Sequence, residues 1–229
     1  MRTGADVWEV FWRATARDGR PPLWDVPADL ARLTEVLDGS LPVVDVGCGN
    51  GTQAVQLAAH FERVIGADAS AAAIDLARRT HPHPNVTYVV LDALDTAAVA
   101  RLHDRCGDAN VHLRGVLHQV APDLRPAFAA AVRRLLGERG TLHLVELAPT
   151  AEAYFAALTA GGPPPALSRV LSAGIRPGVL TAEDVMALLG PRYVAVAGGH
   201  DVLPTTHTLP GGGRASIPAF HLTARLARD

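Results

Sequence analysis

The feature that most constrains this sequence is a cluster of glycines directly after a short run of β-branched residues. Residues 41–46 read Leu-Pro-Val-Val-Asp-Val, residues 47–51 read Gly-Cys-Gly-Asn-Gly, and residues 53–61 carry apolar side chains at helical spacing. Glycine permits positive φ angles and lets the backbone approach a ligand closely. A strand, a glycine loop and a helix in this order predict a ligand-binding turn at the carboxyl end of a parallel strand.

Up to residue 147 the chain alternates short apolar runs with amphipathic segments. We predict strands at 41–46, 63–67, 85–91, 110–113 and 140–147. We predict helices at 28–37, 53–61, 70–79 and 124–136, and a further helix that follows the third strand and ends at about residue 105. Regular alternation of strand and helix indicates a parallel sheet covered by helices on both faces. The fold class is therefore α/β and doubly wound.

The pattern changes after residue 147. Residues 150–160 have a helical pattern and end in a Gly-Gly-Pro-Pro-Pro run, which predicts a helical insertion after the fifth strand. Residues 181–189 form a further helical segment whose first turn nearly matches a capping box. Strands at 193–197 and 217–224 are expected to form a terminal antiparallel pair, separated by a loop rich in glycine and proline over 198–215.

Composition excludes several classes of protein. The 229 residues carry 21 basic and 23 acidic side chains without a basic block, and every basic side chain other than histidine is arginine. We therefore expect no nucleic-acid partner. No apolar run reaches 18 residues, so no membrane span is expected. Two cysteines form no disulfide framework and fit a reducing, cytoplasmic location. We expect one domain over 1–229, and the sequence leaves a homodimer open.

Acidic residues stand beside the glycine loop and after the next two strands. Asp45 precedes the loop and is expected to order it by accepting its N–H groups. Asp68 follows the second strand, 17 residues after Gly51, and Asp92 follows the third. The loop reads G-x-G-x-G and is followed by Thr52, which departs from the G-x-G-x-x-G pattern of dinucleotide-binding enzymes. A nicotinamide oxidoreductase is therefore disfavoured.

These features together resemble the first motifs of the class I S-adenosylmethionine-dependent methyltransferases, over about residues 40–147. The resemblance implies S-adenosylmethionine as the cofactor and a Rossmann-like, seven-stranded sheet whose last strand is antiparallel. It implies that Asp68 binds the ribose hydroxyls and that Asp92 accepts the adenine amine. The cofactor-binding residues expected on this basis are Asp45, Gly47, Cys48, Gly49, Gly51, Asp68, Ala69, Asp92, Ala93 and Arg114.

Ligands of doubly wound sheets bind beyond the carboxyl ends of the strands. Three segments are expected to complete the acceptor side there: an N-terminal lid (1–27), the insertion (150–178) and the loop at 198–215, which carries His207. The lid holds all three tryptophans, Trp8, Trp12 and Trp24. Their aromatic faces could shelter the sulfonium through cation–π contacts, or they could simply hold the N-terminal helix on the core. The lid also resembles the opening of thiopurine- and tellurite-type methyltransferases.

Arg114 and His118 follow the fourth strand, where a Leu-His pair recurs in small-molecule methyltransferases. His118 is the candidate general base and a candidate acceptor-binding residue, because an imidazole titrates near neutrality. A purely structural role is the alternative. Arg114 could contact the methionyl carboxylate of the cofactor or an acidic acceptor, or form a salt bridge on the rim. No acid stands within the fourth strand itself.

The expected reaction is in-line displacement at the sulfonium methyl by a small-molecule acceptor. Because the cofactor is already activated, the protein mainly positions the acceptor and excludes water. Two alternatives stay open at this point: another S-adenosylmethionine chemistry on the same fold, such as cyclisation or aminocarboxypropyl transfer, and a non-catalytic S-adenosylmethionine-binding module.

No metal site is expected. His81 and His83 are separated by one proline, and His200 and His207 by six residues, but no cysteine or carboxylate cluster accompanies either pair at zinc-like spacing.

Overall fold

The computed structural model describes residues 4–22, 24–26, 30–175, 178, 180–209 and 212–227. Parts of four predicted segments lie outside these ranges: lid residues 1–3, 23 and 27, helix residues 28 and 29, insertion residues 176 and 177, and loop residues 210 and 211.

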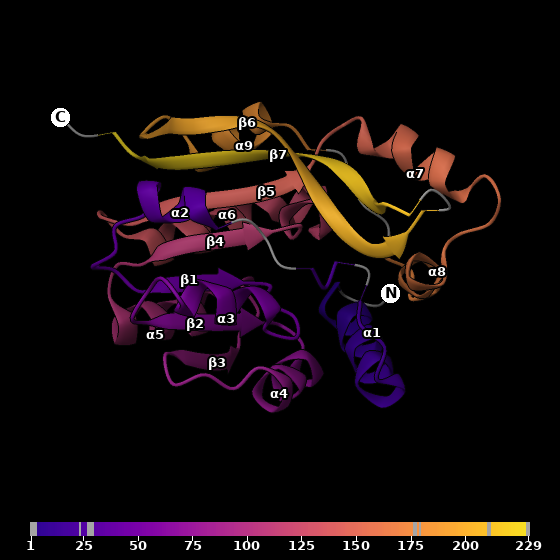
Figure 1. The fold of residues 1–229 in the computed structure, drawn as a ribbon. Coiled ribbons are helices and arrows are strands. Elements are labelled where there is room, and N and C mark those ends of the chain that lie inside the picture. The colour runs from indigo at the N-terminus through magenta and orange to yellow at the C-terminus, as the bar shows by residue number, and fades with distance from the viewer. Residues whose placement is uncertain are drawn as a thin grey trace.

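A seven-stranded sheet in the order β3-β2-β1-β4-β5-β7-β6 forms the centre of the molecule (Figure 1). Its strands are β1 (Val43–Val46), β2 (Val64–Asp68), β3 (Val86–Val90), β4 (Asn110–Arg114), β5 (Thr141–Leu147), β6 (Tyr193–Thr208) and β7 (Arg214–Leu226). The first five strands run parallel, and β7 is antiparallel to both of its neighbours. The predicted fold class is confirmed, including the antiparallel last strand.

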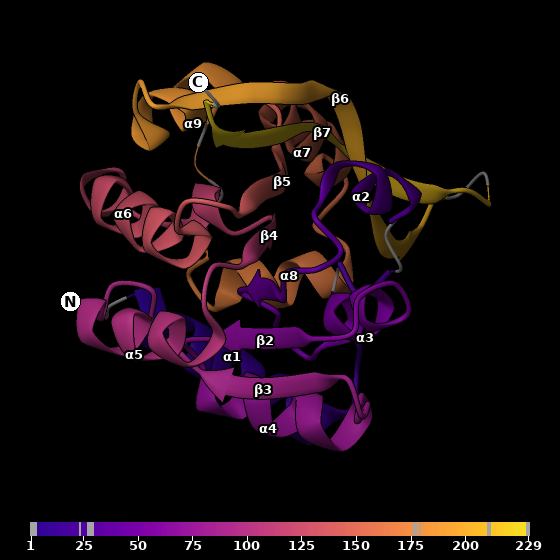
Figure 2. The ribbon, with the colours of Figure 1, turned by 90° about the vertical axis from the view of Figure 1, so that its left-hand side faces the viewer.

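The helices cover both faces of this sheet (Figure 2). They are α1 (Gly4–Asp18), α2 (Ala31–Val36), α3 (Thr52–Ala58), α4 (Ala71–Thr80), α5 (Thr96–Cys106), α6 (Arg125–Leu136), α7 (Ala151–Thr159), α8 (Pro165–Ser172) and α9 (Ala182–Leu189). One buried cluster joins α2, α3 and α4 to the sheet, and a larger one joins α5, α6 and α9 to the opposite face.

Local sequence signals fix several helix ends. The hydroxyl of Ser70 accepts the N–H of Ala73 and caps α4 as predicted, and Asp95 caps α5 in the same way. Thr181 and Asp184 form a complete capping box at the start of α9. α8 starts at Pro165, where the fixed φ of proline suits a first helical position.

The expected loop over 198–215 is wrong for most of its length. β6 and β7 continue as one long hairpin, whose register runs from Tyr193 opposite Leu226 to Thr208 opposite Arg214. β6 is the edge strand of the sheet, so the missing N–H of Pro204 removes no hydrogen bond to a strand on the outer side. A register shift follows Pro204. Breaker residues therefore did not end the strand, and His207 lies on β6.

A row of polar residues crosses the sheet on the α2–α3–α4 side. Asp45, His112, His143 and Thr223 are register partners on β1, β4, β5 and β7, and all four are buried. The imidazoles of His112 and His143 stack with centroids 5.5 Å apart. Burial and the neighbouring His143 lower the pKa of His112 well below its ordinary value. Both histidines therefore belong to the core of the sheet.

The carboxyl ends of the parallel strands point to one edge of the sheet, where α1, α7 and α8 lie (Figure 1). The N-terminal segment and the insertion, far apart in sequence, thus meet at the same edge. Within the described ranges, no helix is long and apolar enough to cross a membrane.

Candidate functional site

A cavity of about 890 Å³ opens at this edge of the sheet. One part of its wall follows the ends of β1, β2 and β3, at Gly47, Asp68 and Asp92. Another part is formed by α7, α8 and the β6–β7 hairpin, including Phe155, Leu167 and Ile217. We call these parts the cofactor half and the acceptor half. A single space thus joins the predicted cofactor motifs to the predicted acceptor segments.

The glycine loop adopts the conformation that its residues predict. Gly47, Gly49 and Gly51 have φ angles of 76°, 54° and 87°. A Cβ on Gly47 would lie 2.6 Å from Cγ2 of Val116, and one on Gly49 would lie 2.6 Å from Cζ2 of Trp12. The loop therefore needs glycine for its backbone angles and for close packing against neighbouring side chains.

The N–H groups of this loop find other acceptors than Asp45. Those of Gly47 and Cys48 donate to the carbonyl of Ala67, at 2.7 and 3.1 Å. The N–H of Gly49 donates to Oδ2 of Asp68 at 2.9 Å. The expected role of Asp45 as acceptor for the loop is thus corrected, because the adjacent strand β2 supplies these oxygens.

Asp45 is instead a buried carboxyl beneath the loop. Burial, together with the negative charge of Asp68, raises the pKa of Asp45 to about 7, while Arg114 acts in the opposite direction. Its Oδ2 atom has no hydrogen-bond partner among the described residues. This group changes charge close to neutral pH in the folded protein.

Asp68 faces the cavity from the end of β2. Its Oδ1 atom accepts the N–H of Ser70 at 2.8 Å, and Oδ2 accepts that of Gly49. Burial raises the pKa of Asp68 to about 6 in spite of these two hydrogen bonds. Each carboxylate oxygen has two acceptor positions, so both oxygens keep one for a further donor such as a ribose hydroxyl.

The remaining cofactor candidates divide into a lining set and a supporting set. The lining set comprises Gly47, Asp68, Ala69, Asp92, Ala93 and Arg114. Asp45, Cys48, Gly49 and Gly51 are not among the described residues that line the cavity, and all four are buried. The Oδ1 atom of Asp92 accepts the N–H of Leu94, which shapes the turn after β3. Burial raises the pKa of the Cys48 thiol well above its ordinary value, so that thiol is no nucleophile.

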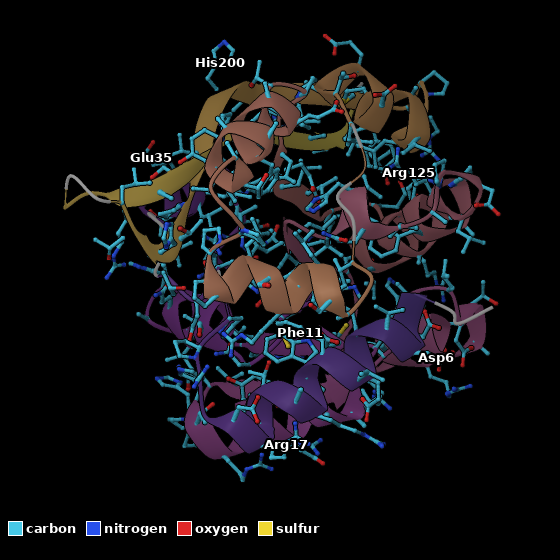
Figure 3. The ribbon with its side chains drawn as sticks, turned by 90° about the vertical axis from the view of Figure 1, so that its right-hand side faces the viewer. Asp6, Phe11, Arg17, Glu35, Arg125 and His200 are labelled. Atoms are coloured by element: carbon cyan, nitrogen blue, oxygen red, sulfur yellow. The ribbon has the colours of Figure 1, made fainter. Side chains whose placement is uncertain are left out.

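The three tryptophans gather around Phe11 at the N-terminal side of the cavity. Phe11 stacks on Trp24 at 5.6 Å, and Trp8 meets both rings edge-on. Figure 3 shows Phe11 pointing from α1 toward α8. Phe11 and Val170 of α8 belong to the same buried cluster. All three tryptophans also line the cavity. The aromatic cluster therefore both holds α1 on the core and forms part of the wall.

Glu9 fastens α1 to the cofactor half. Its Oε2 atom accepts the hydroxyl of Ser70 at 2.6 Å and the N–H of Ala72 at 3.1 Å, at the start of α4. The hydrogen bond from Ser70 lowers the pKa of Glu9 and keeps it charged. This contact lies one residue from Ala69 and could not be predicted from the sequence, since Glu9 and Ser70 are 61 positions apart.

Arg114 lies between the two halves. Its Nη1 atom donates to the carbonyl of Trp24 at 3.2 Å, and its buried Nη2 atom has no partner among the described groups. Its pKa is lowered by burial and raised in part by the charges of Asp45, Asp201 and Asp25. A buried cation with one unused donor, in the wall of a cavity, suits a ligand carboxylate.

His118 lies in the wall of the acceptor half, and its partner is a residue that the sequence analysis missed. Nδ1 of His118 is 2.5 Å from Oε2 of Glu146, a fully buried side chain on β5. The available signal was an acid on the same strand face as Leu142 and Leu144, where the core predicts only apolar residues. His207 is not one of the described residues that line the cavity. The backbone N–H of His207 donates to the hydroxyl of Thr205.

Metal ligation finds no geometric support in the part of the chain that the structure describes. No group of three or more histidine, cysteine or carboxylate side chains there could hold a metal ion.

Comparison with known proteins agrees with this geometry. Residues 43–140 match a family model described as a methyltransferase domain. A solved S-adenosylmethionine-dependent methyltransferase from Anabaena variabilis is 34% identical, with a TM-score of 0.94, and the alignment covers 99% of this chain and 96% of that one.

Two further matches are more limited. N-demethylindolmycin N-methyltransferase of Streptomyces griseus is 45% identical over 87 residues, which are 38% of this chain and 32% of that protein. The chain therefore spans about a third of this curated relative. A structure from work on "conversion of a disulfide bond into a thioacetal group during echinomycin biosynthesis" shares the fold, with a TM-score of 0.73 at 20% identity, covering 97% and 92% of the two chains. On the full-length match, the chain belongs to the S-adenosylmethionine-dependent methyltransferases.

Proposed function

We propose that this protein binds S-adenosylmethionine in the cofactor half and transfers its methyl group to a small, largely apolar molecule in the acceptor half. The observation that carries the proposal is the single cavity that joins Asp68 and Asp92 to the apolar wall at Phe155 and Leu167. In this proposal residues 40–147 are the cofactor-binding core of one domain, and residues 1–27 and 150–178 help to enclose the acceptor.

The residues of the cofactor half fit such a cofactor. Asp68 keeps an acceptor position on each oxygen for the ribose hydroxyls, and Asp92 lies at the end of the next strand for the adenine amine. Leu91 and Ala93 offer apolar contact for the adenine ring. The unpartnered Nη2 atom of Arg114 suits the methionyl carboxylate.

When bound, S-adenosylmethionine supplies a sulfonium methyl group that transfers in line: its C–S bond breaks, with the electron pair staying on sulfur, as the acceptor–carbon bond forms. The protein's part is to hold the acceptor in line and to exclude water. Trp8, Trp12 and Trp24 line the cavity and would offer apolar walls and π faces to the positively charged sulfonium. The partial match to a methyltransferase named for a small-molecule substrate supports a small acceptor.

Isothermal titration of the purified protein with S-adenosylmethionine, S-adenosylhomocysteine and NAD tests the proposal. We expect micromolar binding of the first two ligands and none of NAD. Binding of NAD alone, or of none of the three, would overturn the assignment of the cofactor half. Product analysis with an accepted substrate should then give S-adenosylhomocysteine, whereas methylthioadenosine would indicate transfer of the aminocarboxypropyl group.

A further inference from the structure

Glu146 places a fully buried carboxylate on the face of β5 that otherwise carries Leu142 and Leu144. Its Oε1 atom accepts the N–H groups of Val116 and Leu117, at 2.9 and 2.6 Å, and its Oε2 atom faces Nδ1 of His118 at 2.5 Å. A buried carboxylate is tolerable when such donors surround it. One side chain therefore fixes both the backbone after β4 and the ring of His118.

This arrangement determines which nitrogen of His118 carries the proton. A carboxylate only accepts hydrogen bonds, so Nδ1 of His118 donates to Glu146 and Nε2 keeps its lone pair. The side-chain nitrogen of Gln119 lies 2.5 Å from Nε2, and its N–H donates to that lone pair. Both His118 and Gln119 line the cavity. The base position of the ring is thus held at the wall by a neutral N–H donor.

We propose that Glu146 and His118 form a proton-accepting pair, and that the Gln119 amide holds the place of an N–H or O–H group on the acceptor. This inference rests on the proposed function and names the acceptor class: an apolar molecule with a neutral N–H or O–H nucleophile. The wall of the acceptor half is mostly apolar, and the charged side chains Asp123 and Glu152 in it are acids, while Arg114, between the halves, is assigned to the methionyl carboxylate of the cofactor. An anionic acceptor is therefore disfavoured.

The proton balance follows from this geometry. As the acceptor atom bonds to the methyl carbon, its bond to hydrogen breaks, the electron pair stays on the nitrogen or oxygen, and the proton goes to Nε2 of His118. The resulting imidazolium keeps its Nδ1–H group on Glu146, whose negative charge offsets the new positive charge. The proton then leaves to water when the product departs. Glu146 acts through His118 and is a positioning residue.

The first test reads the tautomer directly, without cofactor or acceptor. NMR of protein labelled with ¹⁵N-histidine should show His118 protonated at Nδ1, with that proton shifted strongly downfield. Glu146→Gln keeps an oxygen for the two backbone N–H groups but turns an N–H toward Nδ1, so we expect the proton to move to Nε2. His118→Gln assigns the signals, and Glu138→Gln, an exposed carboxylate paired with Arg192, is the matched control. A wild-type Nε2–H tautomer, or no change in Glu146→Gln, would overturn the pair.

The second test measures methylation of three matched probes, 2-naphthol, 2-naphthylamine and 2-naphthalenethiol, with radiolabelled S-adenosylmethionine. We expect the hydroxyl or amine probe to react and kcat to fall about 10²-fold or more in Glu146→Gln and in His118→Gln. Reaction of the thiol alone, of none of the probes, or an unchanged kcat in both variants would overturn the acceptor class. Titration with S-adenosylhomocysteine distinguishes failure of the proposed function from failure of the proton-accepting pair. If the wild-type protein does not bind S-adenosylhomocysteine, the proposed function is wrong, whereas the NMR measurement of the His118 tautomer still tests the pair.

Discussion

The two halves of the cavity are assembled from chain segments at very different separations. In the cofactor half, three successive strand ends supply the residues, and the hydrogen bond from Gly49 to Asp68 spans 19 positions. Where the halves meet, Arg114 reaches the carbonyl of Trp24 across 90 positions, and in the acceptor half Thr206 on the hairpin donates to Pro22 across 184. A short motif can encode the first half, whereas the second exists only when distant segments have packed. Substitutions should therefore separate cofactor binding from events on the acceptor side.

The largest expected effect comes from filling the space above the glycine loop. Gly49→Ala places a Cβ against Trp12 and forces alanine into a left-handed conformation. We expect a loss of roughly 3 kcal/mol in unfolding free energy, from backbone strain of about 1–2 kcal/mol and overpacking of similar size, together with loss of S-adenosylhomocysteine binding. Urea unfolding and titration measure the two. Gly19→Ala is the control, because Gly19 has a φ of 64° and nothing within 4 Å; equal losses in both variants would show that Trp12 contributes nothing.

The next effect concerns the pH dependence of stability through Asp45. The pKa of this carboxyl is raised to about 7, above its unfolded value, so its contribution is fully present at acid pH and is lost as pH rises through about 7. Asp45→Asn removes this dependence. Between pH 5 and pH 8 we expect the variant to gain about 3 kcal/mol relative to the wild type.

Urea unfolding of both proteins at the two pH values measures this difference. Comparing the variant with the wild type cancels the opposite trend from His112, whose lowered pKa makes the fold less stable in acid. Asp38→Asn, at a surface carboxyl with a lowered pKa, is the control: Asp38 is ionised in both the folded and the unfolded state at pH 5 and pH 8, so its replacement should leave the difference in stability between these pH values unchanged. Parallel pH profiles for wild type and Asp45→Asn would contradict the prediction.

A smaller effect is expected for Asp68→Asn, measured as affinity for S-adenosylhomocysteine at pH 8. Replacing a charged acceptor by an amide should weaken binding by about 2 kcal/mol, or roughly 30-fold. Wild-type affinity should also fall as pH drops below about 6, the pKa of Asp68, and the variant should not show this fall. Asp95→Asn, at the N-cap of α5, serves as control. Unchanged affinity in Asp68→Asn would remove this residue from the cofactor half.

The smallest effect tests whether the acceptor half is energetically separate. The hydroxyl oxygen of Tyr154 on α7 accepts the N–H of Ser216 on β7 at 3.2 Å. Tyr154→Phe should reduce unfolding free energy by about 1 kcal/mol and leave affinity for S-adenosylhomocysteine unchanged. A clear loss of that affinity would mean that the two halves are coupled through the hairpin.

The same difference in sequence separation explains what could be predicted. Strands up to residue 147 and the lining residues Asp68 and Asp92 follow from local periodicity and motif spacing. Glu146 escaped prediction because its partners are backbone N–H groups and an imidazole about 30 positions away. The antiparallel pair was predicted, but its extension through residues 198–208 was missed because glycine and proline usually end strands, whereas here β6 is an edge strand that tolerates them.

The strand order β5-β7-β6 has a consequence for how the molecule assembles during synthesis. Among the ladders that the structure describes, β6 pairs only with β7, which follows it in the chain and lies between it and β5. A nascent chain ending after residue 208 therefore holds a finished β-strand with no neighbour to join. The strands β1, β2 and β3 can pair with one another earlier in synthesis, because domains acquire structure as their segments emerge from the ribosome. We expect the cofactor half to form first and the acceptor half last, with the unpaired β6 segment as the point most exposed to aggregation or chaperone capture.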